Sequence, residues 1–204
     1  MTQSMFSLYS QHRRITGMSM PSSASLWELV KREQIQKHNA AEIKDIWQEF
    51  HADADKHRIA ATLTGPQYMQ FAEHAGLSPM FVLPVFKGPN AFENFMVQCQ
   101  LPHVLFTSLE EFKRQGTNAL PHFTMTHYTE LLDDKAIVLV RGDIIHPQLV
   151  TRFEAQSLMR LLYEFYTHPS KYSFVHAFNH QQSEFDFKRM LDSLGHDTGA
   201  LPRQ

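Results

Sequence analysis

The sequence predicts an α+β fold: a single domain in which a mainly antiparallel sheet of about six to seven strands is flanked by helices. Two observations predict this class. Consecutive segments of strand character are joined by short turns, which favours antiparallel pairing over βαβ units. Helical segments that begin at capping residues both interrupt and flank this run of strands. The chain has 204 residues, of which 43% are hydrophobic, and this is enough for one core of its own.

The first helices are predicted from capping boxes, in which a polar residue is followed three positions later by glutamate. Ser25 and Glu28 have this spacing, and the segment that follows is free of Gly and Pro through residue 37. Asn39 and Glu42 have the same spacing and open a second helix. The apolar residues of this second helix recur at i, i+3, i+4 and i+7: Ile43, Ile46, Trp47 and Phe50. They lie on one helical face, so this helix is amphipathic.

A run of strands follows in the middle of the chain. A strand at 58–64 leads into a short helix that begins at Gly65-Pro66 and extends to residue 75. The next strand, 80–86, contains Pro84, which cannot donate a ladder hydrogen bond and therefore indicates an edge strand or a bulge. Turn signals at 87–90 and 101–102 then separate two further strands, at 95–100 and 103–107.

The second half of the chain continues this alternation. Ser108 and Glu111 form another capping box, which opens a helix ending near Gly116. Strands are predicted at 122–128 and 136–141, and the second is apolar at every position from 136 to 140, which predicts a central strand covered on both faces. The remaining elements are the longest helix at about 148–166, a strand at 172–178 and a last helix at about 183–194.

Composition excludes several classes of protein. Lys and Arg number 19 against 21 for Asp and Glu, so the chain lacks the basic excess that nucleic-acid binding needs. No run of about 18 apolar residues occurs, so we expect no membrane insertion. The single cysteine, Cys99, leaves no disulfide within the chain, and its apolar strand face predicts a buried, inert thiol. The common phosphate-binding, serine-hydrolase and zinc-protease motifs are missing, so we expect neither a cofactor nor an enzyme.

The 13 histidines invite a metal-site hypothesis, which strand geometry can test. His122 and His127 lie an odd number of residues apart in one predicted strand and therefore point to opposite faces. His176 and His180 would share a strand face but stand roughly 13 Å apart, too far for one zinc ion, unless the strand ended between them. A small metal-dependent or histidine-based enzyme is the alternative function.

Two helices carry aromatic residues outside their apolar stripes. When the helix at 148–166 is projected at about 100° per residue, Phe153 falls in the polar arc, which also contains Arg160. In the last helix, Phe185 points away from the apolar stripe. Exposed aromatic and arginine side chains are typical partner contacts, so the candidate binding residues are Phe153, Arg160 and Phe185. The alternatives are that a neighbouring segment covers Phe153 and that Phe185 packs beneath a Ser183 cap.

The ends of the chain differ in composition from the domain between them. Residues 1–25 contain no acidic residue, are rich in serine and include Arg13 and Arg14, which is typical of a transit peptide or of an ordinary flexible leader. The expected domain covers 26–194, and residues 195–204 are expected to form a flexible tail.

Short stretches spread through residues 26–194 carry one more signal in their order and spacing. They are AEIKDIW (41–47), FH (50–51), FVLP (81–84), FMVQ (95–98), LFTSL (105–109), YTEL (128–131), KAIVLV (135–140), EAQ (154–156), FY (165–166), FN (178–179) and FDF (185–187). In these stretches the chain resembles the family of mitochondrial assembly factors that bind the free β subunit of the ATP synthase F1 sector.

The resemblance implies a function without catalysis. It implies a chaperone of the mitochondrial matrix, monomeric when free, that binds the unassembled β subunit, prevents its aggregation and releases it when the α subunit arrives. It implies no cofactor and supplies no catalytic residue. The sequence leaves open a third hypothesis, a scaffold for a different protein complex.

Overall fold

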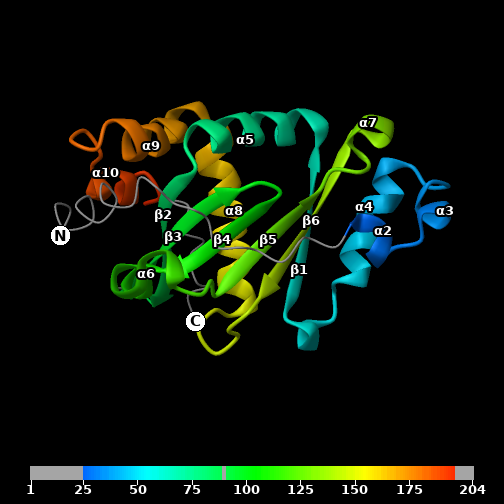
Figure 1. Cartoon of the computed structure of the whole chain (residues 1–204), viewed down its shortest axis with the longest axis horizontal. Coiled ribbons are helices and arrows are strands. Elements are labelled where there is room, and N and C mark those ends of the chain that lie inside the picture. The colour runs from blue at the N-terminus through cyan, green and yellow to red at the C-terminus, as the bar shows by residue number, and fades with distance from the viewer. Residues whose placement is uncertain (1–24, 89–90, 196–204) are drawn as a thin grey trace.

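The computed structural model describes residues 25–88 and 91–195, and within them it confirms the predicted α+β class. Six strands form one antiparallel sheet, and helices pack on its faces and along its end (Figure 1). The expected leader and tail lie outside the described residues, except for Ser25 and Gly195. The expected boundaries of the domain therefore stay predictions.

The strand order of the sheet is β1-β6-β5-β4-β3-β2, with every neighbouring pair antiparallel. Five strands follow one another as a meander: β2 (Met80–Gly88), β3 (Ala91–Gln100), β4 (His103–Ser108), β5 (Phe123–Tyr128) and β6 (Ile137–Ile144). β1 (Arg58–Thr64) pairs with β6, so the first two strands of the chain form the two edges of the sheet. Helix α5 (Gly65–Leu77) connects these edges and runs along one end of the sheet (Figure 1).

Two strand positions agree with the physical argument made for them. Pro84 lies in the edge strand β2, where a missing N–H donor is tolerated. β6 lies between β1 and β5, and its side chains alternate between two hydrophobic clusters. Val138 and Val140 belong to the larger cluster, whereas Ile137 and Leu139 belong to the smaller one. The apolar run of β6 is therefore explained by burial on both faces.

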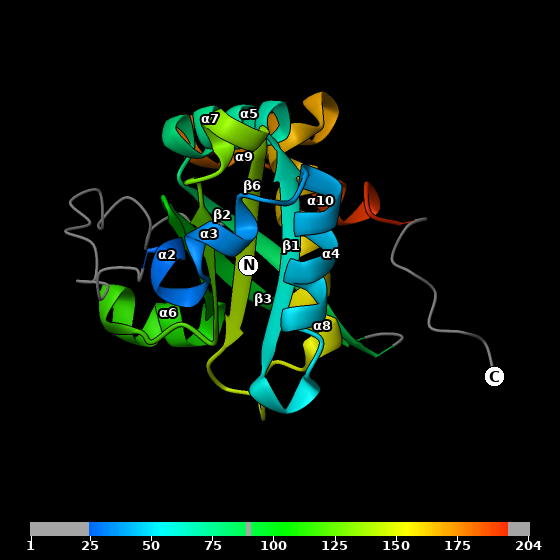
Figure 2. The same cartoon turned by 90° about the vertical axis from the view of Figure 1, so that its right-hand side faces the viewer.

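The larger cluster forms where α8 (Arg152–Thr167), α9 (Pro169–His180) and α5 cover one face of the sheet. The smaller cluster lies on the other face, between β5, β6 and the first helices of the chain. Its members are Leu26, Ile35, Ile43, Trp47, Tyr128, Leu131, Ile137 and Leu139. Figure 2 shows α4 (Ala40–Phe50) running beside β1 at this edge. The edge strand β1 is thereby covered by a helix.

The predicted capping boxes at Ser25 and Asn39 form, whereas the side chain of Ser108 makes no capping hydrogen bond. The side chain of Asn39 accepts a hydrogen bond from the N–H of Glu42 at the start of α4, as predicted. The segment 25–37 is divided into α2 (Leu26–Leu29) and α3 (Arg32–Ile35), because Val30 is extended between them. This break allows apolar residues of both short helices to reach the smaller cluster. The remaining short elements are α6 (Leu109–Gln115), α7 (Leu132–Lys135), and two 3₁₀ turns at Ala54–Lys56 and Gly116–Asn118.

Two predictions about the C-terminal region are wrong. The segment 172–178 is not a strand but belongs to helix α9, which begins with Pro169 in its first turn. Its buried residues Val175, Phe178 and Asn179 have the i, i+3, i+4 spacing of a helix. The last helix is shorter than predicted: α10 covers Phe187–Asp192 and is capped by Asp186 rather than by Ser183.

Candidate functional site

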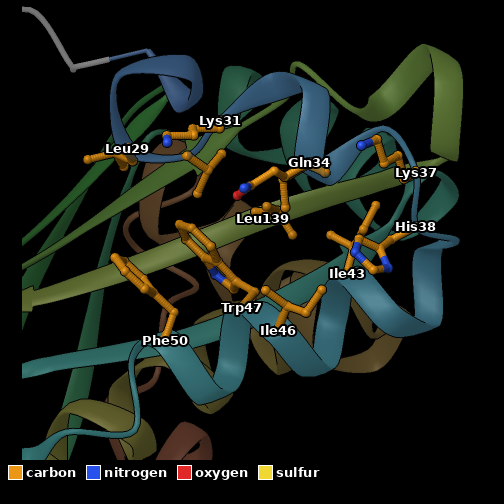
Figure 3. A pocket seen from close by; sticks show the side chains of 12 residues that line it. Leu29, Lys31, Gln34, Lys37, His38, Ile43, Ile46, Trp47, Phe50 and Leu139 are labelled. Carbon is orange, nitrogen blue, oxygen red and sulfur yellow. The ribbon is translucent and has the colours of Figure 1, made fainter.

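An apolar groove lies between the first helices of the chain and α4, over strand β6 (Figure 3). Its volume is about 540 Å³, which is within the range of ligand-binding pockets. Two-thirds of its lining residues are apolar. The lining consists of Leu29, Val30, Lys31, Gln34, Ile35, Lys37, His38, Ile43, Ile46, Trp47, Phe50 and Leu139. Leu139 of β6 forms its floor, because it is completely buried.

The amphipathic face of α4 supplies one wall of the groove. Ile43 and Trp47 are buried, whereas Ile46 and Phe50 on the same face are 37% and 53% exposed. All four residues line the groove, but Ile43 and Trp47 also pack in the smaller cluster, whereas Ile46 and Phe50 remain exposed to solvent. Figure 3 shows these side chains on one side of the groove, opposite Lys31 and Gln34.

Hydrogen bonds hold the two walls of the groove in place. The indole N–H of Trp47 donates to the carbonyl oxygen of Val140 at 3.0 Å, which ties α4 to β6. At the start of α2, which leads into the opposite wall, the N–H of Leu26 donates to the carboxylate of Glu130, which also accepts from the hydroxyl of Ser25. Both walls are thus fixed to the sheet side of the molecule before any partner binds.

The polar residues of the lining are basic or neutral. Lys31 and Lys37 are exposed, and His38 lies 3.3 Å from the carboxylate of Glu42. Glu42 is outside the lining, and its hydrogen bond from the Asn39 backbone, with a second from His38, lowers the pKa of its carboxyl group. The lining itself contains no carboxylate, hydroxyl or thiol group. Its chemistry is therefore that of an apolar binding site with a positively charged rim.

The structure separates the three residues predicted as partner contacts. Phe153 lies on α8 and is 64% exposed, so no described segment covers it. Arg160 is half-exposed on the same helix and donates to the carboxylate of Glu164 at 2.9 Å. Phe185 is buried and packs against Phe178, with 5.1 Å between the ring centroids. The prediction that Phe185 lies on the surface is wrong, because this residue precedes α10 and inserts into the core.

One link connects the groove with the exposed start of α8. The guanidinium of Arg152 donates to the carbonyl oxygen of His51 at 3.0 Å and to that of Arg58. His51 directly follows Phe50, and Arg152 directly precedes Phe153. The end of α4 and the beginning of α8 are therefore joined at the two positions that present exposed phenylalanines. Sequence reasoning found Phe153 but not the groove.

The histidines do not assemble a metal centre within residues 25–88 and 91–195, where no group of three or more His, Cys, Asp or Glu side chains could hold an ion. His176 and His180, however, are closer than predicted. They lie one helical turn apart on α9, with 4.8 Å between ring centroids, because the segment is a helix and not a strand.

The expected burial of Cys99 is confirmed, and burial raises the pKa of its thiol to about 12. None of the helices in the described ranges has the length and hydropathy to cross a bilayer.

Comparison with known proteins gives consistent matches. The model of the ATP11 protein family matches residues 7–191. The chain is 27% identical over 165 residues to Protein atp11, mitochondrial, of Schizosaccharomyces pombe, which covers 78% of this chain and 57% of that protein. It is 29% identical over 174 residues to ATP synthase mitochondrial F1 complex assembly factor 1 of Danio rerio, covering 83% and 56%. The human protein of the same name is 28% identical over 166 residues, covering 79% and 49%. The chain thus spans about half the length of the curated relatives it matches.

Proposed function

This chain belongs to the ATP11 protein family, and from this premise we propose that it is an assembly chaperone of the mitochondrial ATP synthase. In this proposal it binds the unassembled β subunit of the F1 sector in the mitochondrial matrix, as a monomer. It prevents the β subunit from aggregating and releases it when the α subunit arrives. We call the bound subunit the client. The observation that carries the proposal is the family match over residues 7–191.

The surface of the molecule supports a role in protein binding. An orphan subunit exposes the apolar surface that its partner covers in the assembled complex, and such surfaces aggregate. A chaperone that covers this surface needs exposed apolar residues of its own. Ile46, Phe50 and Phe153 are three of the ten large apolar residues that are exposed on the described surface. Release to the α subunit requires competition for the same client surface, which favours an interface of moderate affinity with a polar component.

The proposed activity needs no catalytic chemistry. Covering and releasing a protein surface involves no covalent step, so neither a cofactor nor a nucleophile is required. The groove offers apolar contacts and positive charge rather than acid, base or nucleophile pairs. We therefore place the protein among binding proteins rather than enzymes.

The test is a capture experiment with isolated subunits. Recombinant full-length protein is immobilised and exposed to the purified β subunit and, separately, to the purified α subunit. We expect retention of β but not of α, together with suppression of β aggregation in a light-scattering assay at a near-equal molar ratio. Failure to retain β, or aggregation at the same rate with and without the chaperone, contradicts the proposal. Equal retention of both subunits contradicts its specificity for β.

A further inference from the structure

We propose that the groove between α3 and α4 binds an amphipathic segment of the client in which carboxylates flank the apolar side chains. This inference rests on the proposed function and adds to it a docking site and the chemistry of the segment that occupies it. Two features of the groove carry it: its exposed apolar wall and the sign of the charge on its rim.

The apolar wall can accept side chains from a partner. Phe50 is 53% exposed and Ile46 is 37% exposed, although both belong to a helix whose neighbouring positions Ile43 and Trp47 are fully packed. The ring of Phe50 lies over that of Trp47, with 6.4 Å between centroids. These contacts hold Phe50 in place while a large part of its surface faces solvent. A rigid aromatic of this kind loses little conformational freedom on binding, which is the property of an interface anchor.

The rim specifies the charge of the occupant. Lys31 and Lys37 line the groove, and no carboxylate does. Neither lysine forms an ion pair with another described residue. The guanidinium of the nearby Arg32, by contrast, lies over the Trp27 ring at 5.2 Å from its centroid. Carboxylates on the incoming segment would pair with these ammonium groups and fix its register on the apolar wall. A basic segment would be repelled.

The same charge argument disfavours the chain's own leader as the occupant. Residues 1–24 contain no Asp or Glu, and they include Arg13 and Arg14. Placing this segment against Lys31 and Lys37 would bring like charges together. An acidic amphipathic segment of the client satisfies both features of the groove, whereas the leader satisfies the apolar feature alone.

The experiment places a fluorescent reporter on the rim of the groove in the full-length protein. An environment-sensitive dye is attached through Gln34→Cys, because the natural thiol Cys99 is buried and unreactive, with a pKa of about 12. Titration with isolated β subunit should shift the emission to shorter wavelength. A matched protein labelled at Met69→Cys, which is an exposed position on α5, should show no shift.

Substitutions then separate the apolar wall from the charged rim. Phe50→Glu should weaken capture of β by about tenfold or more, and Met69→Glu, with the same chemistry at a similarly exposed position, should not. The double variant Lys31→Glu/Lys37→Glu should weaken capture as well. Its control is Lys44→Glu/Lys188→Glu, which changes the net charge equally at exposed lysines outside the lining. Unchanged urea midpoints show that the variants are folded.

Tiled peptides of the β subunit test the chemistry of the segment directly. Peptides that shift the dye should combine apolar residues with Asp or Glu. If the acids of such a peptide are replaced by Lys, it should lose binding to the natural groove and regain it with Lys31→Glu/Lys37→Glu. Restored binding of the charge-reversed pair is a result that a merely structural role of the lysines cannot produce.

The outcomes distinguish the two levels of the proposal. If wild-type protein does not retain β, the proposed function fails and the groove assignment falls with it. If β is retained but does not shift the emission of the dye at Gln34→Cys, and the groove variants capture β as well as wild type, the function stands and the groove assignment is overturned. A dye response to deletion of residues 1–24 without β assigns the groove to the leader instead. A response to unlabelled copies of this chain, with dimers in sedimentation, assigns it to self-association, and either result overturns the proposal.

Discussion

The indole N–H of Trp47 donates a hydrogen bond of 3.0 Å to the backbone carbonyl oxygen of Val140, and this bond joins α4 to β6. Trp47 is 2% exposed, and its ring also meets the edge of Tyr128 at a centroid distance of 5.8 Å. One residue thus fixes the helix that carries both the buried and the exposed part of the amphipathic face. The position of Phe50 on the groove wall depends on this anchor.

The substitution Trp47→Phe tests the anchor. It keeps an apolar ring but removes the N–H donor, so the Val140 carbonyl loses this partner in a buried position. We expect the free energy of unfolding, measured with urea, to fall by about 1–3 kcal/mol. Gln48→Ala, at an exposed position of the same helix outside the groove lining, should change it by no more than about 0.5 kcal/mol. Equal stability of Trp47→Phe and wild type would show that the hydrogen bond contributes nothing.

The sequence predicted α4 and its face but not the groove, and the reason is physical. Periodicity shows which residues share a helical face, yet it cannot show how wide a strip of that face the neighbouring elements cover. Here α2 and α3 cover Ile43 and leave Ile46 and Phe50 exposed. The groove also includes Leu139 from a strand far along the chain. The local sequence indicates the groove only through the apolar residues Leu29, Val30 and Ile35, which lie around the break between α2 and α3.

The C-terminal region shows how one wrong element changes the residues derived from it. Aromatic and β-branched residues made 172–178 resemble a strand, but Pro169 in the first turn and the spacing of Val175 and Phe178 fit a helix. The predicted separation of His176 and His180, which assumed a strand, is therefore wrong as well: on the helix their ring centroids lie 4.8 Å apart. Similarly, Phe185 was projected on a helix that in fact begins at Phe187, so its direction could not be read from helical periodicity.

Phe153→Glu tests the second exposed surface. The side chain is 64% exposed, so replacing it should leave the melting temperature nearly unchanged. If Phe153 contacts the client, capture of the β subunit should weaken by more than about 1 kcal/mol, measured by titration. Arg160→Ala on the same helix tests the other predicted contact, and its ion pair with Glu164 should contribute less than about 1 kcal/mol to stability. A large fall in melting temperature for Phe153→Glu would show that this residue is part of the core.

Phe185→Ala tests the corrected position of the third residue. Phe185 is buried against Phe81 and Phe178, with centroid distances of 6.2 and 5.1 Å. Removing the ring leaves a cavity, so the free energy of unfolding should fall by about 3–5 kcal/mol. At a temperature where the variant is still folded, its affinity for the β subunit should match that of wild type. Wild-type stability with lost affinity would instead place Phe185 at the interface.

His127 makes stability depend on pH. It is 2% exposed on β5, and its Nδ1 lies 3.0 Å from the carbonyl oxygen of Pro102. A carbonyl can only accept, so Nδ1 carries the proton, and Nε2 accepts from the hydroxyl of Tyr163 at 2.9 Å. Both contacts are satisfied by the neutral ring with its proton on Nδ1. Burial lowers the pKa of His127 from 6.5 to about 4, opposed by the bond to Pro102 and assisted by His103.

We expect this histidine to destabilise the protein in mild acid. Between about pH 6.5 and 4, the unfolded chain binds a proton at His127 that the folded chain does not, so stability is complete above pH 6.5 and is lost as the pH falls toward 4. The loss is up to about 1.4 kcal/mol for each pH unit in this window. His127→Gln keeps a donor and an acceptor but does not titrate, so its unfolding free energy should fall less steeply from pH 7 to 4.5. Between pH 7 and 8 the unfolding free energies of the two proteins should change in parallel. Identical slopes of unfolding free energy against pH below pH 6.5 would contradict the role assigned to His127. Some slope should remain in the variant, because burial also lowers the pKa of His51, His103 and His122.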